Sequence, residues 1–176
     1  MQTKRILRYA LTIGFVFLLA VLQTTVLHAV RLFGVMPNLL LSAVVCYSLT
    51  KGDYAAVVFG LGCGLVLDVF GGRTVGMNTL LCLYVSLVCI LLYGGLFNNN
   101  VFVAMLFVLL LSIPYDFLIY FFTLFIWGET DILYALFHKI LPGAVYNALI
   151  TFFVYPFARA LAVEWTEKRR ERKRIR

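Results

Sequence analysis

The sequence has few charged residues and no long polar stretch. Charged side chains make up 13% of its 176 residues, whereas hydrophobic side chains make up 63%. A single soluble core of this length cannot bury so many apolar side chains, so lipid must cover the remainder. No polar interval between the apolar segments is long enough to fold by itself. Residues 1–176 are therefore predicted to form one integral membrane domain.

The sequence motifs of soluble enzymes are missing as well. No glycine-rich phosphate loop opens a helix after a strand, and His28 and His138 lack the paired spacing of a metal site. The four cysteines lie inside apolar segments without a CxxC pair, which is typical of small core side chains. They are Cys46, Cys63, Cys82 and Cys89. The sequence predicts neither an enzyme nor a protein with a metal or another cofactor.

Six apolar segments are candidates for transmembrane helices, each of which needs about 17–25 residues. They cover residues 7–30, 35–50, 54–70, 77–97, 101–127 and 140–163. The second and third are short, so a re-entrant hairpin is an alternative to two crossings. The turn between them contains Lys51 and Asp53, whose charges prefer water and favour two crossings. Pro37 and Pro142 are expected near the starts of their helices, where a missing amide hydrogen is harmless.

Basic residues are divided unevenly between the two sides of the predicted membrane domain. With six crossings, only Arg31, Arg73 and Lys139 of the 15 Lys and Arg residues lie on the side opposite both termini. The positive-inside rule therefore predicts that both termini are cytoplasmic.

The basic tail, residues 164–176, is expected to continue the last helix. It holds seven cations: Lys168, Arg169, Arg170, Arg172, Lys173, Arg174 and Arg176. Beside a membrane these side chains are expected to bind anionic lipid and to fix the orientation of the chain. A cytoplasmic protein partner is the alternative, and nucleic acid is not expected.

Small residues recur at four-residue intervals in the third segment. Gly60, Gly64 and Asp68 share one helix face, and the same spacing continues to Gly72 and Gly76. Glycines on a helix face allow another backbone to approach closely. We therefore expect a partner helix to pack on this face.

Asp68 lies near the outer end of the third segment. We expect its carboxylate to face the bundle and to organise the turn from Gly71 to Gly76, by accepting hydrogen bonds from backbone amides or from Arg73. The alternative is an ordinary interfacial residue with access to water.

Asp116 lies in the middle of the fifth segment, deeper than Asp68. An acid at such a depth is a functional candidate, either in a proton path or as a polar joint to another helix. No Lys or Arg lies at a matching depth, so its expected partners are neutral. The candidates are Asn78, Ser112, Tyr146 and Asn147. Two isolated acids without a cation or a metal-ligand set make coupled transport the weaker alternative.

In combination, these residues resemble the family of the rod shape-determining protein MreD. The resemblance rests on the glycine and aspartate run from Gly60 to Gly76, on the sequence from Met36 to Leu40, and on the sequence from Tyr146 to Leu149. It implies a component of the bacterial cytoplasmic membrane that binds the single-span protein MreC and, with it, the cell-wall synthase and transpeptidase. It also implies an all-α fold of six transmembrane helices, similar to the substrate-binding subunits of energy-coupling-factor vitamin transporters.

The resemblance therefore leaves two functions to compare. The first is a non-enzymatic scaffold that holds partner helices in the membrane. The second is a vitamin-capture subunit, which needs an outward pocket lined by convergent polar groups. The predicted outer loops are short and sparingly polar, which favours the scaffold.

Overall fold

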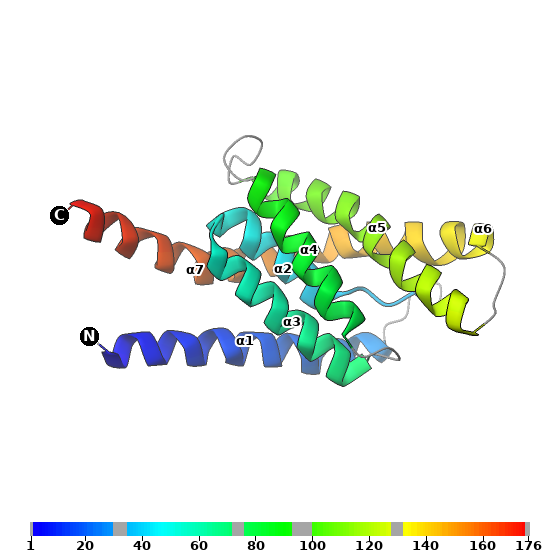
Figure 1. The fold of residues 1–176 in the computed structure, drawn as a ribbon, viewed down its shortest axis with the longest axis horizontal. Helices are drawn as coiled ribbons and strands as arrows, with labels where there is room; N and C mark the ends of the chain where they lie inside the picture. Colours follow the sequence, from blue (N-terminus) through cyan, green and yellow to red (C-terminus); the bar gives the residue numbers. More distant parts are fainter. Residues whose placement is uncertain (1, 30–34, 72–75, 93–99, 128–131, 175–176) are drawn as a thin grey trace.

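The computed structural model describes residues 2–29, 35–71, 76–92, 100–127 and 132–174 (Figure 1). Nearly all of these residues are helical. The elements are α1 (Gln2–Ala29), α2 (Leu39–Lys51), α3 (Tyr54–Gly71), α4 (Met77–Leu92), α5 (Val101–Trp127), α6 (Ile132–Ala135), the π-helical segment η1 (Leu136–Ile140) and α7 (Leu141–Arg174). Because α6, η1 and α7 follow one another without a break, they form one long helix.

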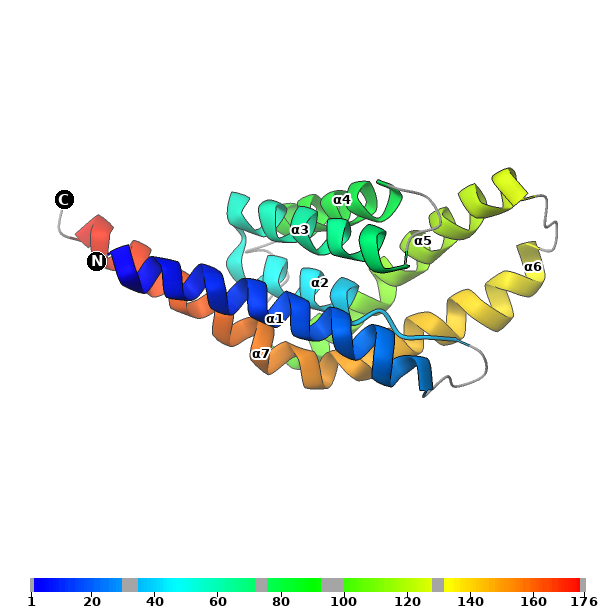
Figure 2. The same cartoon turned by 90° about the horizontal axis from the view of Figure 1, so that it is seen from below.

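The short helix α2 lies at the centre of the bundle. It contacts α1, α3, α4, α5 and α7, and all 13 of its residues are buried. Figure 2 shows α3 and α4 on one side of it, with α1 and α7 on the other. At 1.5 Å per residue α2 is about 20 Å long, shorter than the hydrocarbon layer of about 30 Å. It is largely apolar, as expected of a helix that other helices surround.

The second helix begins later than its apolar pattern predicts. Asn38 is its N-cap: the side-chain oxygen of Asn38 accepts a hydrogen bond of 2.9 Å from the amide of Leu41. Pro37 therefore precedes the cap, outside the first helical turn. A side chain that accepts from a free amide at the start of a helix competes with continuation of that helix toward the N-terminus.

The last helix begins at Ile132, eight residues before the predicted start at residue 140. Pro142 consequently lies inside a continuous helix rather than in its first turn. The π-helical segment precedes this proline directly, and the amide of Leu141 donates to the carbonyl of Leu136. A wider turn at this point relieves the clash between a proline ring and the carbonyl of the preceding turn.

The surface of the bundle is strongly apolar, and several polar side chains are buried inside it. Val69, Leu91 and Phe102 are 80%, 84% and 78% exposed. The buried polar side chains include Ser42, Ser86, Ser112, Asn147 and Thr151. This distribution is the reverse of that in soluble proteins and is typical of helices that pack within lipid. Two helical stretches, Val101–Phe122 and Leu133–Ala162, are long and apolar enough to cross a membrane.

The two ends of the described chain lie at the same end of the bundle. Both views show the start of α1 and the end of α7 at this end (Figures 1 and 2). α7 remains helical into the basic tail as far as Arg174, as the sequence predicts. Arg176 lies outside the described residues.

Candidate functional site

Asp68 lies where the last turns of α3 meet the start of α4. Its carboxylate oxygens accept five hydrogen bonds. Three come from the backbone amides of Gly76, Asn78 and Thr79, at 3.0, 3.1 and 3.1 Å. The other two come from Nδ2 of Asn78 at 3.0 Å and from Oγ1 of Thr79 at 2.5 Å. Asp68 is only 7% exposed, so these donors take the place of water around its carboxylate.

This arrangement makes Asp68 the cap of a helix to which it does not belong. The amides of Asn78 and Thr79 lie in the first turn of α4 and have no acceptor within that helix. An N-cap side chain normally accepts from such amides, but the residue before α4 is Gly76, which has no side chain. The carboxylate of Asp68 fills this role from α3. A negative charge at this position also interacts favourably with the dipole of α4.

The geometry matches only part of what the sequence predicts for Asp68. Amide donors are expected from the turn that ends at Gly76, and the Gly76 amide is one of them. The side chains of Asn78 and Thr79 are additional donors that we did not anticipate. Their signal in the sequence is a pair of polar residues directly after the glycine turn. Gly72 and Arg73, also named as candidates, lie outside the described residues.

The glycine face of α3 packs against α4 of the same chain. A Cβ atom added to Gly64 would lie 2.5 Å from Thr79 Cα and 2.9 Å from the carbonyl oxygen of Asn78. A Cβ atom at Gly60 would collide with the Ser86 side chain. The expectation of a partner helix on this face is therefore corrected, because α4 occupies it. The close approach brings Asp68 within reach of the first amides of α4.

Tyr115 extends this polar junction to α5. Its hydroxyl donates to Oδ1 of Asn78 at 2.8 Å, and the tyrosine is 2% exposed. Asn78 thus donates to Asp68 with its amide groups and accepts from Tyr115 with its oxygen. We call Asp68, Asn78, Thr79 and Tyr115 the Asp68 junction. It joins α3, α4 and α5.

Asn147 forms a second polar joint, on α7. Its Oδ1 accepts from the amide of Asn38 at 2.6 Å, and its Nδ2 donates to Ser112 Oγ at 3.1 Å. Asn147 is 1% exposed. Because Asn38 caps α2 and Ser112 belongs to α5, one side chain connects α7 to two other helices.

Three of the four partners predicted for Asp116, namely Asn78, Ser112 and Asn147, bond to other residues. Asp116 faces α7, where a Cβ atom added to Gly143 would lie 3.7 Å from Asp116 Oδ2. No hydrogen bond joins Asp116 to Asn78, Ser112 or Asn147, since these side chains bond to the partners named above. The sequence places these residues at similar depths in the membrane but does not show in which direction each side chain points. Among the described residues, no group of three His, Cys, Asp or Glu side chains could hold a metal ion.

Helices with an apolar exterior and buried polar joints define the class of this protein, which is an all-helical membrane protein. The chain belongs to the MreD family, because the family model for the rod shape-determining protein MreD matches residues 3–163. The resemblance found in the glycine and aspartate motifs is thus confirmed. Members of this family are bacterial inner-membrane proteins with a role in rod shape determination. Comparisons with curated proteins and with solved structures give no significant match.

Proposed function

We propose that this protein is a non-enzymatic scaffold of the bacterial cell-wall elongation machinery. In this role it binds MreC and helps to position the peptidoglycan synthase and the transpeptidase. The observation that carries the proposal is the match to the MreD family over residues 3–163. The Asp68 junction lies inside the matched range.

The arrangement of polar groups supports a structural role. The side chains of Asp68 and Asn147 both form hydrogen bonds with other helices of their own chain. Such joints hold helices in fixed positions within a low-dielectric interior. Partner helices then bind on the exterior of the bundle, since α4 already covers the glycine face of α3. The scaffold acts by holding these outer faces in a constant arrangement.

The membrane topology is part of the proposal, with six crossings and both termini in the cytoplasm. It is supported by the distribution of basic residues and by the start of α1 and the end of α7, which lie at one end of the bundle. All four native cysteines are buried, so a cysteine-free background is a practical starting point. Single cysteines near Gly34, Arg73 and Glu129 should react with an impermeant reagent in intact cells. Cysteines near Gly52 and Asn99 should not react, and external labelling near Asn99 would contradict six crossings.

Purification of the full-length protein in mild detergent tests partner binding. We expect MreC to co-purify with it, followed by the synthase and the transpeptidase at lower yield. An unrelated polytopic membrane protein, expressed at the same level, is the control. A folded, monodisperse preparation that retains no MreC would disprove the scaffold role.

The vitamin-capture alternative rests on the proposed likeness to energy-coupling-factor subunits. It requires polar groups that are free to converge on a ligand, whereas those of the Asp68 junction bond to one another. A thermal-shift screen against vitamins separates the two functions. A scaffold should show no ligand-dependent rise in its melting temperature, and a capture subunit should show a large rise with one vitamin.

A further inference from the structure

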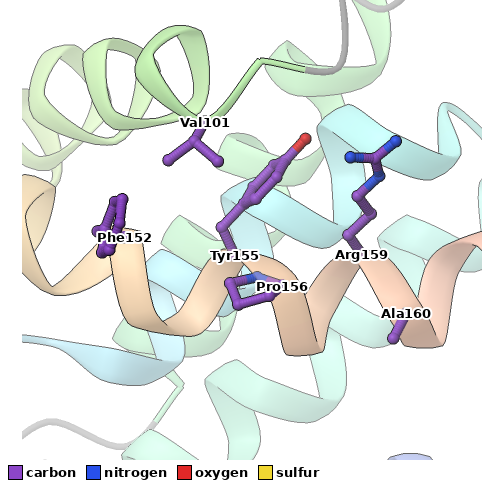
Figure 3. A pocket seen from close by; sticks show the side chains of 6 residues that line it. All are labelled: Val101, Phe152, Tyr155, Pro156, Arg159 and Ala160. Carbon is purple, nitrogen blue, oxygen red and sulfur yellow. The ribbon is translucent and has the colours of Figure 1, made fainter.

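A hollow of about 610 Å³ opens between the start of α5 and the middle of α7. Figure 3 shows the side chains that line it. They are Val101, Phe152, Tyr155, Pro156, Arg159 and Ala160. The hollow is separate from the Asp68 junction and from Asn147, and none of the roles described above uses it.

The hollow is apolar at one end and cationic at the other. Phe152, Pro156 and Ala160 follow one another at four-residue intervals and line one wall, with Val101 opposite. The Arg159 side chain extends beside the Tyr155 hydroxyl (Figure 3). Phe152 and Arg159 are seven residues apart, which corresponds to about 10 Å along a helix. The shape and polarity suit a ligand with an anionic head and an apolar chain.

The start of α5 borders the hollow through Val101. Val101 is the first residue of that helix, and the first amides of a helix lack intrahelical acceptors and favour anions. A guanidinium group adds bidentate hydrogen bonds to phosphate oxygens. Arg159 is itself exposed, so a phosphate group can reach it from the membrane surface.

We propose that this hollow binds an anionic phospholipid from the surrounding bilayer. The phosphate lies on Arg159, and the upper part of one acyl chain lies along Phe152 and Pro156. Basic sites between transmembrane helices recognise anionic headgroups in this way. The site lies where α7 leaves the bundle toward the basic tail, so a bound lipid would link that helix to α5.

Native mass spectrometry of the delipidated full-length protein tests the proposal. The probes are phosphatidylglycerol, phosphatidylcholine and inorganic phosphate at equal concentrations. We expect at least fivefold more phosphatidylglycerol than phosphatidylcholine to remain bound, and no stable phosphate adduct. Equal retention of the two lipids would overturn the proposal. Inorganic phosphate bound as tightly as phosphatidylglycerol would overturn it too, because the acyl chain would then be irrelevant.

Two pairs of variants locate the lipid. Arg159→Gln should reduce the amount of bound phosphatidylglycerol to that of phosphatidylcholine. The control Lys139→Gln removes an exposed cation near the other end of the long helix and should not reduce the bound phosphatidylglycerol. Ala160→Trp should fill the hollow and displace both lipids, whereas Ala10→Trp, on an exposed position of α1, should displace neither. Thermal unfolding in detergent confirms that each variant is folded. An equal loss of lipid in a variant and its control would place the lipid elsewhere.

Discussion

Asp68 and Asp116 are both carboxylates in strongly apolar helices, but their surroundings differ. Asp68 accepts five hydrogen bonds, most of them from the first turn of α4. Asp116 faces α7 near Gly143 and has no hydrogen bond with the asparagine and serine side chains expected around it. Their hydrogen bonding differs because each acid lies against a different part of the neighbouring helix. Asp68 meets the start of a helix, where amides lack acceptors, and Asp116 meets a helix interior, where amides are already bonded.

This difference assigns separate roles to the two acids. A carboxylate that caps a neighbouring helix is a structural joint, and its loss should affect folding and assembly. A carboxylate opposite a helix interior contributes little to the bundle and is the better candidate for a role outside it. Depth in the membrane does not distinguish these two roles, since any acid within a transmembrane segment is a functional candidate. The predictions below test the comparison, beginning with the largest effect.

Gly64→Leu should disrupt the contact between α3 and α4 that supports the Asp68 junction. A Cβ atom alone would lie 2.5 Å from Thr79 Cα, and backbone cannot rotate away as a side chain can. We expect the free energy of unfolding in detergent to fall by about 3 kcal/mol or more. Gly62→Leu is the matched control on the same helix, because an added Cβ meets nothing within 4 Å. Its effect should stay within about 0.5 kcal/mol.

Gly143→Ala applies the same test beside Asp116. The new Cβ would lie 3.2 Å from Cγ1 of Val35, which is a side-chain atom that can shift. We expect a loss below about 1 kcal/mol. A loss at Gly143→Ala as large as that at Gly64→Leu would show that the Asp116 region is packed as tightly as the Asp68 junction.

Asp68→Asn should destabilise the protein much more than Asp116→Asn. An amide at position 68 keeps one oxygen but turns an NH2 group either toward the two donors of Asn78 or toward the donors of Gly76 and Thr79. Hydrogen bonds to charged groups contribute about 1.5–3 kcal/mol each, so a loss of about 2–3 kcal/mol is expected, with less MreC in the purified complex. Asp116→Asn should change stability by no more than about 0.5 kcal/mol. Equal melting temperatures for the two variants would remove the distinction between the acids.

Proton uptake into vesicles provides the second measurement on the same pair. A scaffold predicts no flux with the wild-type protein or with either variant. Flux that disappears only in Asp116→Asn would show transport, because a neutral amide cannot exchange a proton.

Gly76→Ala tests the turn before α4, where the amide of Gly76 donates to Asp68. Gly76 has φ = 90°, which L-residues other than glycine adopt at a cost of about 1–2 kcal/mol. Nothing lies within 4 Å of an added Cβ, so the loss of stability should come from the backbone alone. Gly62→Ala, in a helical conformation and in open space, should leave stability unchanged or raise it slightly. Similar melting temperatures for the two alanine variants would contradict strain at Gly76.

Periodicity and composition predict much of the helical framework. α3 (Tyr54–Gly71) and α5 (Val101–Trp127) coincide with the third and fifth apolar segments to within one residue. The apolar pattern does not show that α2 is the central helix, because a segment that is apolar on all sides suits both lipid and a protein interior. It also misses the early start of the last helix, since Pro142 normally indicates a first turn.

The candidate site is predictable only in part, for a related reason. Four-residue spacing shows that Gly60, Gly64 and Asp68 share a face, but spacing within one helix does not reveal which helix covers that face. The answer depends on which helix packs against α3, and the tertiary structure shows that it is α4. The predicted start of the fourth segment at residue 77 agrees with that of α4, but only the packing of α4 on α3 shows that Asn78 and Thr79 donate to Asp68.

Tyr115→Phe removes a single hydrogen bond and tests whether the Asp68 junction acts as one network. The substitution keeps the ring and removes only the hydroxyl that donates to Asn78 Oδ1. Interhelical hydrogen bonds in membranes average about 0.6 kcal/mol and reach about 1.7, so a loss in that range is expected. Asn78 still donates to Asp68 through its backbone and side chain in this variant.

A double-mutant cycle combines Tyr115→Phe with Asp68→Asn. The combined loss of stability should be smaller than the sum of the two single losses, because both changes act through Asn78. Strict additivity would show that α5 is joined to α4 independently of Asp68.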